Sequence, residues 1–307
     1  MSDERILVVG GTGLVGNALV RGWTRRGKTV TAATYHCRQT AAFRQLDMQD
    51  ADAVKKLIGE VAPTLVALPA ANPFVDYCEL HPEETRKVNV DGSINVIKAA
   101  SARGARVIFF SSDYVFDGGK GDYHEDDRVN PLNEYGRQKA EVEAAIAKAG
   151  PRHLVIRTSG AYGWQWEPKN FVLQIRSKLS KGEAMTIAEG IRYNPTYTEN
   201  LADIVCALAD SGQGGIFHVV GGERIARIEF ARAAAKAFGL DDRLIKGVPA
   251  DQFKAPALRP KESSLNTAKI RAAVNVPIWG VKESLRHMVS FEPAWKEYAE
   301  KTPAEKI

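Results

Sequence analysis

The 307-residue sequence has little cysteine, and what it has is scattered. Its three cysteines, Cys37, Cys78 and Cys206, are isolated, and none forms the Cys-x-x-Cys pair that is typical of metal and redox sites. We therefore expect no metal site and no disulfide framework. Reduced thiols are the simpler interpretation, as in a protein of the cytosol.

Long apolar runs and mixed basic–aromatic runs are also missing. No apolar stretch approaches the roughly 18 residues that a membrane span needs, and the first residues show no signal-peptide pattern. We expect a cytoplasmic protein without a membrane anchor. The formal charge of +5 suits anionic partners such as nucleotides, or simply a soluble surface. Without basic runs that alternate with aromatic residues, we expect no nucleic-acid partner.

What is present is a regular alternation of strand and helix patterns in the first half. Buried-strand patterns cover residues 6–9, 29–34, 64–68, 107–110 and 153–157, and helical spacing covers residues 14–23, 51–61, 83–102 and 134–149. This alternation predicts βαβ units, and hence an α/β fold with a doubly wound parallel Rossmann sheet.

The pattern becomes irregular after about residue 160. We expect a dinucleotide-binding Rossmann domain over residues 1–160, completed by elements within about 196–220. Residues 161–307 are then expected to form mainly a smaller substrate-binding lobe. The polar tail, residues 301–307, is expected to be frayed.

A glycine-rich turn connects the first strand pattern to the first helix pattern. One glycine allows the tight turn, a second lets the backbone approach a pyrophosphate, and a third lets the helix pack on the strand. The helix N-terminus then offers free N–H groups to the anion. The strand-turn-helix context therefore predicts a dinucleotide site over Gly10-Gly11-Thr12-Gly13-Leu14-Val15-Gly16.

The residues beyond the turn favour NADP over NAD. NAD sites usually carry an acidic residue about 20 positions further on, but no acidic residue occurs between Glu4 and Asp47. That place holds His36 and Arg38, and a guanidinium can pair with a 2′-phosphate. Arg38 could equally be a solvated loop charge, and NAD stays open as the cofactor.

Two residues after the expected third strand complete the predicted adenosine site. The carboxylate of Asp47, followed by Met48, could accept a hydrogen bond from the adenine amino group. It could equally cap the helix that begins near Ala51.

A catalytic group is predicted from three residues in chain order. Tyr135 and Lys139 stand four apart on a helical stretch and share one face. A neighbouring ammonium should lower the pKa of the tyrosine and make it a usable acid near neutral pH. Ser112 closes the strand at 107–110, where ligands of open α/β sheets bind, and it can hold a carbonyl oxygen.

These motifs resemble the extended short-chain dehydrogenase/reductases, and within them the dTDP-4-dehydrorhamnose reductase branch. The resemblance runs over nearly the whole chain. It rests on Gly10 to Gly16, Ala70-Ala71, Asn89-Val90-Asp91-Gly92, Ser111-Ser112-Asp113-Tyr114-Val115-Phe116-Asp117-Gly118, Asn130-Pro131-Leu132-Asn133, Arg157-Thr158-Ser159, Tyr162-Gly163, Pro195-Thr196, and Arg259-Pro260 before Ser263, Leu265 and Thr267.

The resemblance implies roles for particular residues. Ser112 matches the active-site Ser/Thr, Tyr135 the catalytic acid and Lys139 its partner, while Ala70-Ala71 would contact the cofactor and Asp113 the substrate. Nucleotide-sugar dehydratases carry Asp-Glu after the active-site residue, and fucose-type epimerase-reductases carry Cys; this sequence has Asp113-Tyr114. Both differences favour simple reduction of a 4-keto nucleoside diphosphate sugar by NADPH.

The same segments resemble the regulatory subunit of methionine adenosyltransferase, an NADP-binding partner protein. That alternative stays open, and a homodimer is one assembly that we consider. In the lobe, Trp164 could stack on a substrate ring or serve in packing. Arg192 and Arg259 could neutralise a substrate diphosphate or form surface ion pairs.

Overall fold

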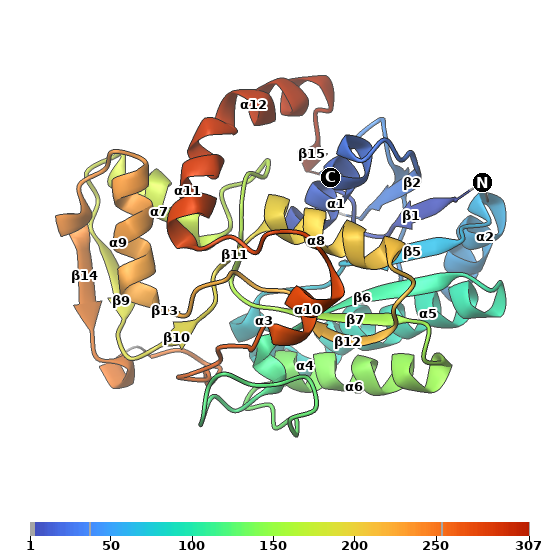
Figure 1. Ribbon diagram of the computed structural model, residues 1–307, viewed down its shortest axis with the longest axis horizontal. Helices are drawn as coiled ribbons and strands as arrows, with labels where there is room; N and C mark the ends of the chain where they lie inside the picture. Colours follow the sequence, from blue (N-terminus) through green and yellow to red (C-terminus); the bar gives the residue numbers. More distant parts are fainter. Residues whose placement is uncertain (1–3, 37, 253, 307) are drawn as a thin grey trace.

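A seven-stranded parallel sheet forms the centre of the computed structural model, which describes residues 4–36, 38–252 and 254–306 (Figure 1). Every neighbouring pair in it is parallel. The predicted doubly wound α/β fold is confirmed. The strand order is β12 (Gly215–His218), β7 (Leu154–Thr158), β6 (Arg106–Ser112), β5 (Leu65–Leu68), β1 (Ile6–Val8), β2 (Val30–Tyr35) and β4 (Arg44–Gln45).

Helices cover both faces of the sheet (Figure 1). On one face, α1 (Leu14–Arg25) packs against α8 (Thr198–Asp210). On the other, α5 (Ser93–Ala102) packs between α2 (Ala51–Val61) and α6 (Glu134–Ala149). The strands are therefore buried on both sides, which explains why they read as continuous apolar runs.

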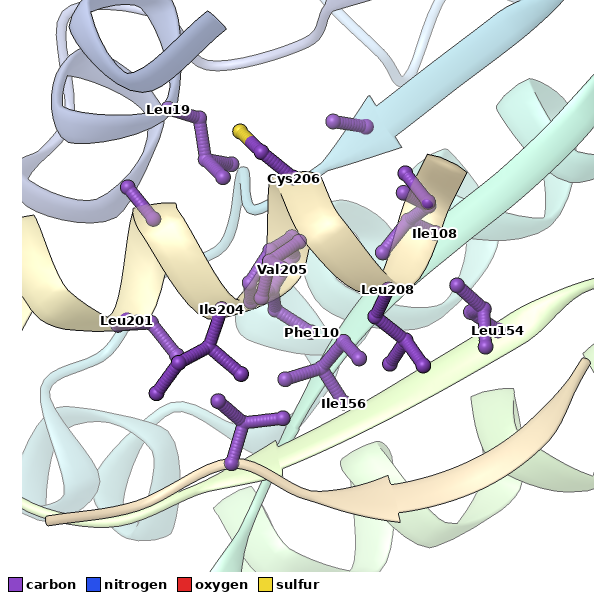
Figure 2. Close-up of a cluster of buried hydrophobic side chains, with 14 of the residues drawn as sticks. Leu19, Ile108, Phe110, Leu154, Ile156, Leu201, Ile204, Val205, Cys206 and Leu208 are labelled. Carbon is purple, nitrogen blue, oxygen red and sulfur yellow. The ribbon is translucent and has the colours of Figure 1, made fainter. Parts of the chain in front are cut away.

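The alternation of side chains along each strand divides the core into two clusters. In β6, Ile108 and Phe110 face the α1/α8 layer, whereas Val107 and Phe109 face the α2/α5/α6 layer. Figure 2 shows the first cluster, in which Leu201 and Ile204 of α8 lie over the sheet. Burying each such side chain stabilises the fold by about 1.5–3 kcal/mol.

The segment predicted as one helix over 83–102 contains a π-helical turn. It consists of α4 (Pro82–Arg86), the π-helix η1 (Lys87–Gly92) and α5, and the short helix α3 (Val75–Leu80) precedes it. Gly92 sits in this turn, where a Cβ atom would lie 2.9 Å from the Cβ of Met48. The missing side chain therefore lets the helix approach the loop after β4.

A second core lies in the lobe built after β7 (Figure 1). It joins α7 (Phe171–Leu179), α9 (Arg227–Ala237), α11 (Val281–Ser290), α12 (Glu292–Lys301) and the parallel pair β9 (Met185–Ala188) and β14 (Ile245–Val248). Within 196–220, β12 and α8 join the central sheet and its covering layer. The domain boundary near residue 160 stays a prediction.

Short elements complete the chain. They are η2 (Asp113–Val115), β8 (Ala161–Tyr162), β10 (Arg192–Tyr193), β11 (Thr196–Tyr197), β13 (Ile225–Ala226), η3 (Asp242–Leu244), η4 (Ala250–Gln252) and α10 (Ala268–Ala273). Among the described residues, no helix combines the length and apolar character that crossing a membrane would require.

The prediction of a frayed tail is wrong. Strand β15 (Glu305–Lys306) pairs antiparallel with β3 (Arg38–Gln39), and Ala304 is buried. Just before it, the hydroxyl of Tyr298 on α12 accepts a hydrogen bond from Asn17 on α1 at 2.9 Å. The described part of the tail is held because pairing with β3 satisfies its backbone and Ala304 packs inward, which its polar composition does not reveal.

Candidate functional site

The glycine turn lies at the carboxyl end of β1, between the sheet and α1. Gly10 has φ of +91°, which favours glycine. A Cβ atom on Gly16 would lie 2.1 Å from the carbonyl oxygen of Gly10, so a side chain there would push the helix off the turn. These two positions have the geometry that the predicted dinucleotide site requires.

The N-terminus of α1 has no capping side chain. Gly13 is its N-cap residue and makes no side-chain cap bond, and the first turn holds no acidic residue. By contrast, Asp50, Asn133 and Asn170 cap the N-termini of α2, α6 and α7. The free N–H groups of α1, next to Thr12, Leu14 and Val15, are thus available to an anion.

The small residues after β5 pack against the turn. The amide of Ala70 donates to the carbonyl oxygen of Val9 at 3.2 Å, and a Cβ atom on Gly10 would lie 2.8 Å from the Ala70 side chain. Ala71 is half-buried beside it. Their role in cofactor binding stays a prediction.

At the adenosine end, the structure decides one of the alternatives for Asp47. The cap of α2 is Asp50, whose carboxylate accepts from the amides of Asp52 and Ala53. Asp47 instead accepts from the amide of Gln49 at 2.9 Å. The capping alternative for Asp47 is therefore wrong, while its contact with adenine and that of the buried Met48 stay predictions.

Arg38 is engaged by segments far away in the sequence. It forms an ion pair with Glu167, and its Nη1 donates to the carbonyl oxygen of Ala304 at 2.6 Å. His36 is exposed after the end of β2. Arg38 is therefore not a free loop charge: a 2′-phosphate would have to share it with Glu167 and the tail.

Ser112 ends β6, where its side chain begins the turn η2. Its Oγ donates to Oδ1 of Asp113 at 3.0 Å and accepts from the amide of Tyr114 at 3.2 Å. The serine is almost wholly buried, with 8% of its surface exposed. The turn therefore fixes the hydroxyl at the carboxyl edge of the sheet.

Asp113 was predicted to contact substrate, but it faces inward. It is buried, and Oδ2 accepts from the hydroxyls of Ser159 at 2.7 Å and Ser263 at 2.6 Å. Burial raises the pKa of this carboxyl. Both oxygens already accept from serines, and a contact of Asp113 with substrate stays a prediction.

Tyr135 reaches this turn because α6 packs closely on it. A Cβ atom on Gly136 would lie 2.1 Å from the carbonyl oxygen of Tyr114, and the rings of Tyr114 and Tyr135 meet edge to face at 6.3 Å. Asn133 caps the helix through the amide of Gly136 at 2.9 Å. Tyr135 therefore packs on the turn that carries Ser112, and their joint catalytic role stays a prediction.

Lys139 lies under Tyr135. Its Nζ donates to the carbonyl oxygen of Phe110 at 2.8 Å and lies 5.6 Å from the centre of the Tyr135 ring. Burial lowers the pKa of Lys139 to about 8 and raises the pKa of Tyr135. The expected lowering of the Tyr135 pKa is therefore wrong in this structure, because burial is the largest cause of the shift and raises it.

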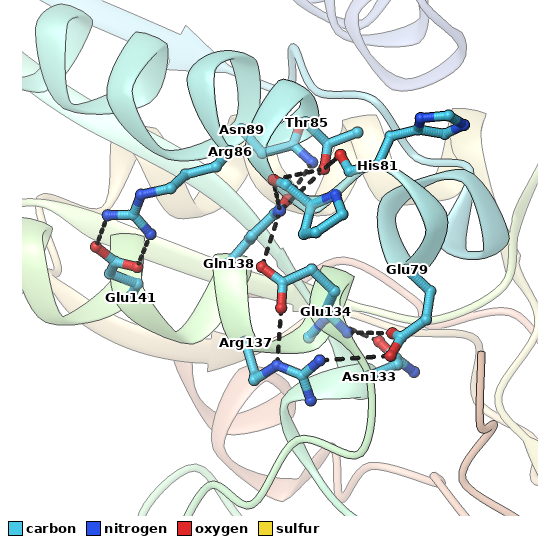
Figure 3. Close-up of polar contacts among 12 residues, drawn as sticks. Glu79, His81, Thr85, Arg86, Asn89, Asn133, Glu134, Arg137, Gln138 and Glu141 are labelled. Atoms are coloured by element: carbon cyan, nitrogen blue, oxygen red, sulfur yellow. Dashed lines mark hydrogen bonds and ion pairs between the residues drawn. The ribbon is translucent and has the colours of Figure 1, made fainter. Parts of the chain in front are cut away.

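The helix that carries both residues is held by a polar network that the sequence did not indicate (Figure 3). Buried Asn89 donates to Gln138 Oε1 at 2.8 Å, and Gln138 donates to Thr85 Oγ1 at 3.0 Å. The Glu79 carboxylate accepts from the amide of Glu134 at 2.7 Å. These contacts tie the start of α6 to α3, α4 and η1, and so orient Tyr135.

The segment 257–265 forms another wall of the site. Arg259 makes a bidentate ion pair with Asp76 of α3, at 2.5 and 2.7 Å, and Asn133 donates to the carbonyl oxygen of Leu258 at 2.8 Å. Tyr114 contributes to raising the pKa of Arg259, which places this arginine beside the turn η2. Its role toward a substrate stays a prediction.

Trp164 and Arg192, the other two residues predicted to contact substrate, lie in the lobe. Trp164 is buried in the lobe core, donates to the carbonyl oxygen of Met288 at 2.8 Å and packs on Arg176. This is the packing role that the sequence left as the alternative.

Arg192 is exposed on β10, which pairs with β13. Arg227, which sequence reasoning missed, acts electrostatically on Tyr114 and Tyr193 and lies 4.4 Å from the centre of the Phe171 ring.

The two cysteines in the described part of the chain form no disulfide. Cys78 and Cys206 are buried and free, and Cys37 lies outside the described residues. Residues 4–36, 38–252 and 254–306 contain no group of three or more His, Cys, Asp or Glu side chains placed to hold a metal ion.

Comparison with known proteins gives two kinds of relatives. A dTDP-4-dehydrorhamnose reductase of Mycolicibacterium smegmatis is 31% identical over 290 residues, covering 94% of this chain and 85% of that protein. The methionine adenosyltransferase 2 subunit beta of Bos taurus is 30% identical over 294 residues, covering 92% and 87%.

The fold is also that of a solved reductase. The dTDP-4-dehydrorhamnose reductase of Bacillus anthracis str. Ames, in complex with NADP, superposes with a TM-score of 0.85 at 24% identity, covering 94% of this chain and 99% of that one. Residues 4–292 match the family described as RmlD substrate binding domain. The chain therefore belongs to the RmlD substrate-binding domain family of Rossmann-fold oxidoreductases, as its motifs predicted.

Proposed function

We propose that this protein is an NADPH-dependent reductase of a 4-keto nucleoside diphosphate sugar. The observation that carries the proposal is the convergence of Ser112, Tyr135 and Lys139 at the carboxyl ends of the strands, beside the glycine turn. This is where ligands of open α/β sheets bind. The reductase relative at 31% identity supports the same chemistry.

The turn fits a dinucleotide. Without side chains, Gly10 and Gly16 let the turn pack directly against Ala70 and against the start of α1, and the uncapped N-terminus of α1 offers N–H groups to a pyrophosphate. Lys139 would face the nicotinamide ribose beneath Tyr135. When bound, the reduced nicotinamide supplies a hydride to the carbonyl carbon.

Residues of the chain bind the substrate carbonyl oxygen and supply the proton that it receives. Ser112 and Tyr135 would donate hydrogen bonds to the carbonyl oxygen, which polarises the C=O bond. As the carbon gains its new C–H bond, the π electrons move to oxygen, and the proton of Tyr135 passes to that oxygen. Burial raises the pKa of Tyr135, so it holds its proton at neutral pH and is ready to donate it to an alkoxide, a much stronger base.

Lys139 stabilises the phenolate that this transfer leaves. Its ammonium lies 5.6 Å from the ring centre, among buried groups where a charge acts strongly. Tyr135→Phe keeps the ring and removes only the hydroxyl. We expect NADPH binding to survive and turnover to fall by about 10² or more.

The assay is NADPH oxidation with 4-keto nucleotide sugars. Tyr77→Phe is the matched control, because its exposed hydroxyl donates to Glu84 on the surface. Undiminished turnover in Tyr135→Phe would contradict the mechanism.

The preference for NADPH rests on Arg38 and the acid-free stretch before Asp47. We expect NADPH to bind at least about tenfold more tightly than NADH, roughly 1.4 kcal/mol, and Arg38→Ala to remove most of that difference. Glu167 competes for the same guanidinium, so Glu167→Gln should strengthen NADPH binding and leave NADH nearly unchanged. Fluorescence titration of both cofactors with the three proteins measures all six affinities, and equal affinities in the unmutated protein would exclude the idea.

The substrate diphosphate would meet the wall formed by segment 257–265. Arg259 lies beside Tyr114 and Arg227 acts on the same ring, so two cations border the turn that holds Ser112. We expect a nucleoside diphosphate to raise the melting temperature, and Arg259→Ala or Arg192→Ala to reduce that protection. No protection by any nucleoside diphosphate would count against a sugar-nucleotide substrate.

A second candidate is an NADP-binding regulatory subunit, favoured by the 30% identity to methionine adenosyltransferase 2 subunit beta. The two candidates differ in turnover and in partners. No NADPH oxidation with any 4-keto nucleotide sugar, together with tight NADPH binding and a stable complex with a methionine adenosyltransferase catalytic subunit, would select the second. Homodimer formation stays a prediction for either.

A further inference from the structure

Asp113 is a buried acid that the mechanism above does not use. It directly follows Ser112, only 3% of its surface is exposed, and its carboxyl meets hydroxyls from three separate segments. Such a group costs much free energy as an isolated charge, so its protonation state has consequences for its neighbours.

The hydrogen atoms around Oδ2 can be assigned. Among the hydrogen bonds of the described residues, the hydroxyls of Ser159 and Ser263 have Asp113 Oδ2 as their acceptor, at 2.7 and 2.6 Å. Both serines therefore donate to it, and Oδ2 accepts twice. A proton on the carboxyl would accordingly sit on Oδ1, the oxygen that faces Ser112 at 3.0 Å.

The Asp113 carboxyl takes part in none of the ion pairs formed by the described residues. The titratable groups that face it are the phenols of Tyr114, Tyr135 and Tyr193, whose pKa values its charge would raise further. Arg227 and Arg259 act on Tyr114. Among the described residues, the side chains that hydrogen-bond this acid are three serine hydroxyls.

The Ser112 hydroxyl has one hydrogen to give. Its oxygen already accepts from the amide of Tyr114 at 3.2 Å. If Asp113 is ionised, that hydrogen is held by Oδ1 and cannot reach a substrate. If Asp113 is protonated, Oδ1–H can donate to the serine oxygen, which leaves the serine hydrogen free to point outward.

We propose that Asp113 is a positioning residue which, as a neutral acid, donates a hydrogen bond from Oδ1 to Ser112 and thereby directs the Ser112 hydrogen toward the substrate carbonyl oxygen. This inference rests on the proposed reductase function. Burial favours the neutral form and raises the pKa of the carboxyl. The neutral acid also keeps negative charge away from the oxygen on which the reaction builds it.

Asparagine separates this role from a merely structural one. In Asp113→Asn the amide oxygen can accept from Ser159 and Ser263 while the NH₂ group donates to Ser112, as the neutral acid would. Asp113→Ala removes the donor and the acceptor. Asp117→Asn is the matched control, since that carboxylate lies in the same sequence string and accepts from Tyr123 and Asn130 instead.

The first measurement is the pH dependence of kcat and kcat/KM. We expect Asp113→Asn to stay within about threefold of the unmutated enzyme at neutral pH and Asp113→Ala to lose about tenfold or more, mainly in kcat. Activity of the unmutated enzyme should fall with rising pH through the ionisations of Lys139 and Asp113. In Asp113→Asn only the Lys139 ionisation remains, so its alkaline limb is shallower or lies at higher pH.

Two outcomes would overturn the inference. One is an Asp113→Ala variant that keeps the kcat of the unmutated enzyme. The other is an equal loss in the asparagine and alanine variants, which a structural role predicts.

A second measurement does not depend on turnover. Carbon-13 NMR of labelled aspartate carboxyls, with Asp113→Asn to assign the signal, should report a protonated Asp113 at pH 7. An ionised signal there would also reject the inference. If the unmutated protein reduces no 4-keto nucleotide sugar, the proposed function fails, while this spectrum still decides the state of Asp113.

Discussion

A methyl group at position 136 would separate α6 from the turn that carries Ser112. The Cβ atom of Gly136→Ala would lie 2.1 Å from the carbonyl oxygen of Tyr114 and 2.9 Å from the Cβ of Pro131. Backbone cannot yield as a flexible side chain can, so the helix must move by about 1 Å to restore normal contact. Overpacking of this kind costs about 1–3 kcal/mol.

The displacement would act directly on the chemistry, because Tyr135 is the preceding residue. A misplacement of about 1 Å can lower turnover by about 10². We therefore expect Gly136→Ala to lower both the free energy of unfolding and kcat. Thermal denaturation and NADPH oxidation measure the two effects.

Gly59→Ala is the matched control, the same change inside α2. The nearest atoms there belong to the end of the Arg103 side chain, at 3.3 Å, which can move aside. Alanine favours helix by up to about 1 kcal/mol over glycine, so this variant should be as stable as the unmutated protein or more stable. Gly136→Ala with equal stability and full turnover would refute the packing argument.

Two further predictions concern α6. Glu143→Gln should lower the free energy of unfolding by about 3–5 kcal/mol, because it removes the ion-pair partner of the buried Arg157 (2.7 and 2.9 Å in the intact pair). Glu141→Gln breaks an exposed bidentate pair with Arg86 (Figure 3) and should cost less than about 1 kcal/mol. Chemical denaturation measures both losses, and equal losses would contradict this prediction. Burial lowers the pKa of Lys139 to about 8, below its unfolded value near 10.4. Between these two pH values the unfolded chain binds more protons than the folded chain, so the free energy of unfolding should rise with pH across that window. Turnover should fall as pH rises through about 8. Lys139→Met should remove the rise in stability, and an unchanged stability profile in that variant would show that another group is responsible.

The glycine turn, the Tyr135/Lys139 pair and the strands could be predicted from the sequence, because each depends on residues close to it in the chain. The glycine turn follows its strand and precedes its helix, so the residues on either side of Gly10 and Gly16 were enough to predict it. Tyr135 and Lys139 share a helical face by spacing alone. The strands of the parallel sheet likewise showed as apolar runs, since both of their faces are covered.

The contacts around those motifs could not be predicted from the sequence, because the residues that make them come from distant segments of the chain. Ser263 lies 150 positions from the carboxyl that it contacts, and Ala304 lies 266 positions from Arg38. The sequence left stacking and packing open for Trp164, and the carbonyl partner that shows packing comes from α11. A composition rule could not place any of these contacts, since each depends on how the lobe closes on the sheet.

The same reasoning explains why the pKa of Tyr135 was predicted in the wrong direction. Spacing places an ammonium near a phenol, and a charge pair alone would lower the pKa. Burial opposes this, and its size depends on α3, η2 and segment 257–265, all packed around α6. Sequence spacing thus names the acid, but only the folded environment decides when it holds its proton. Here it holds the proton at neutral pH, which suits the proposed role of Tyr135 as the proton donor to an alkoxide.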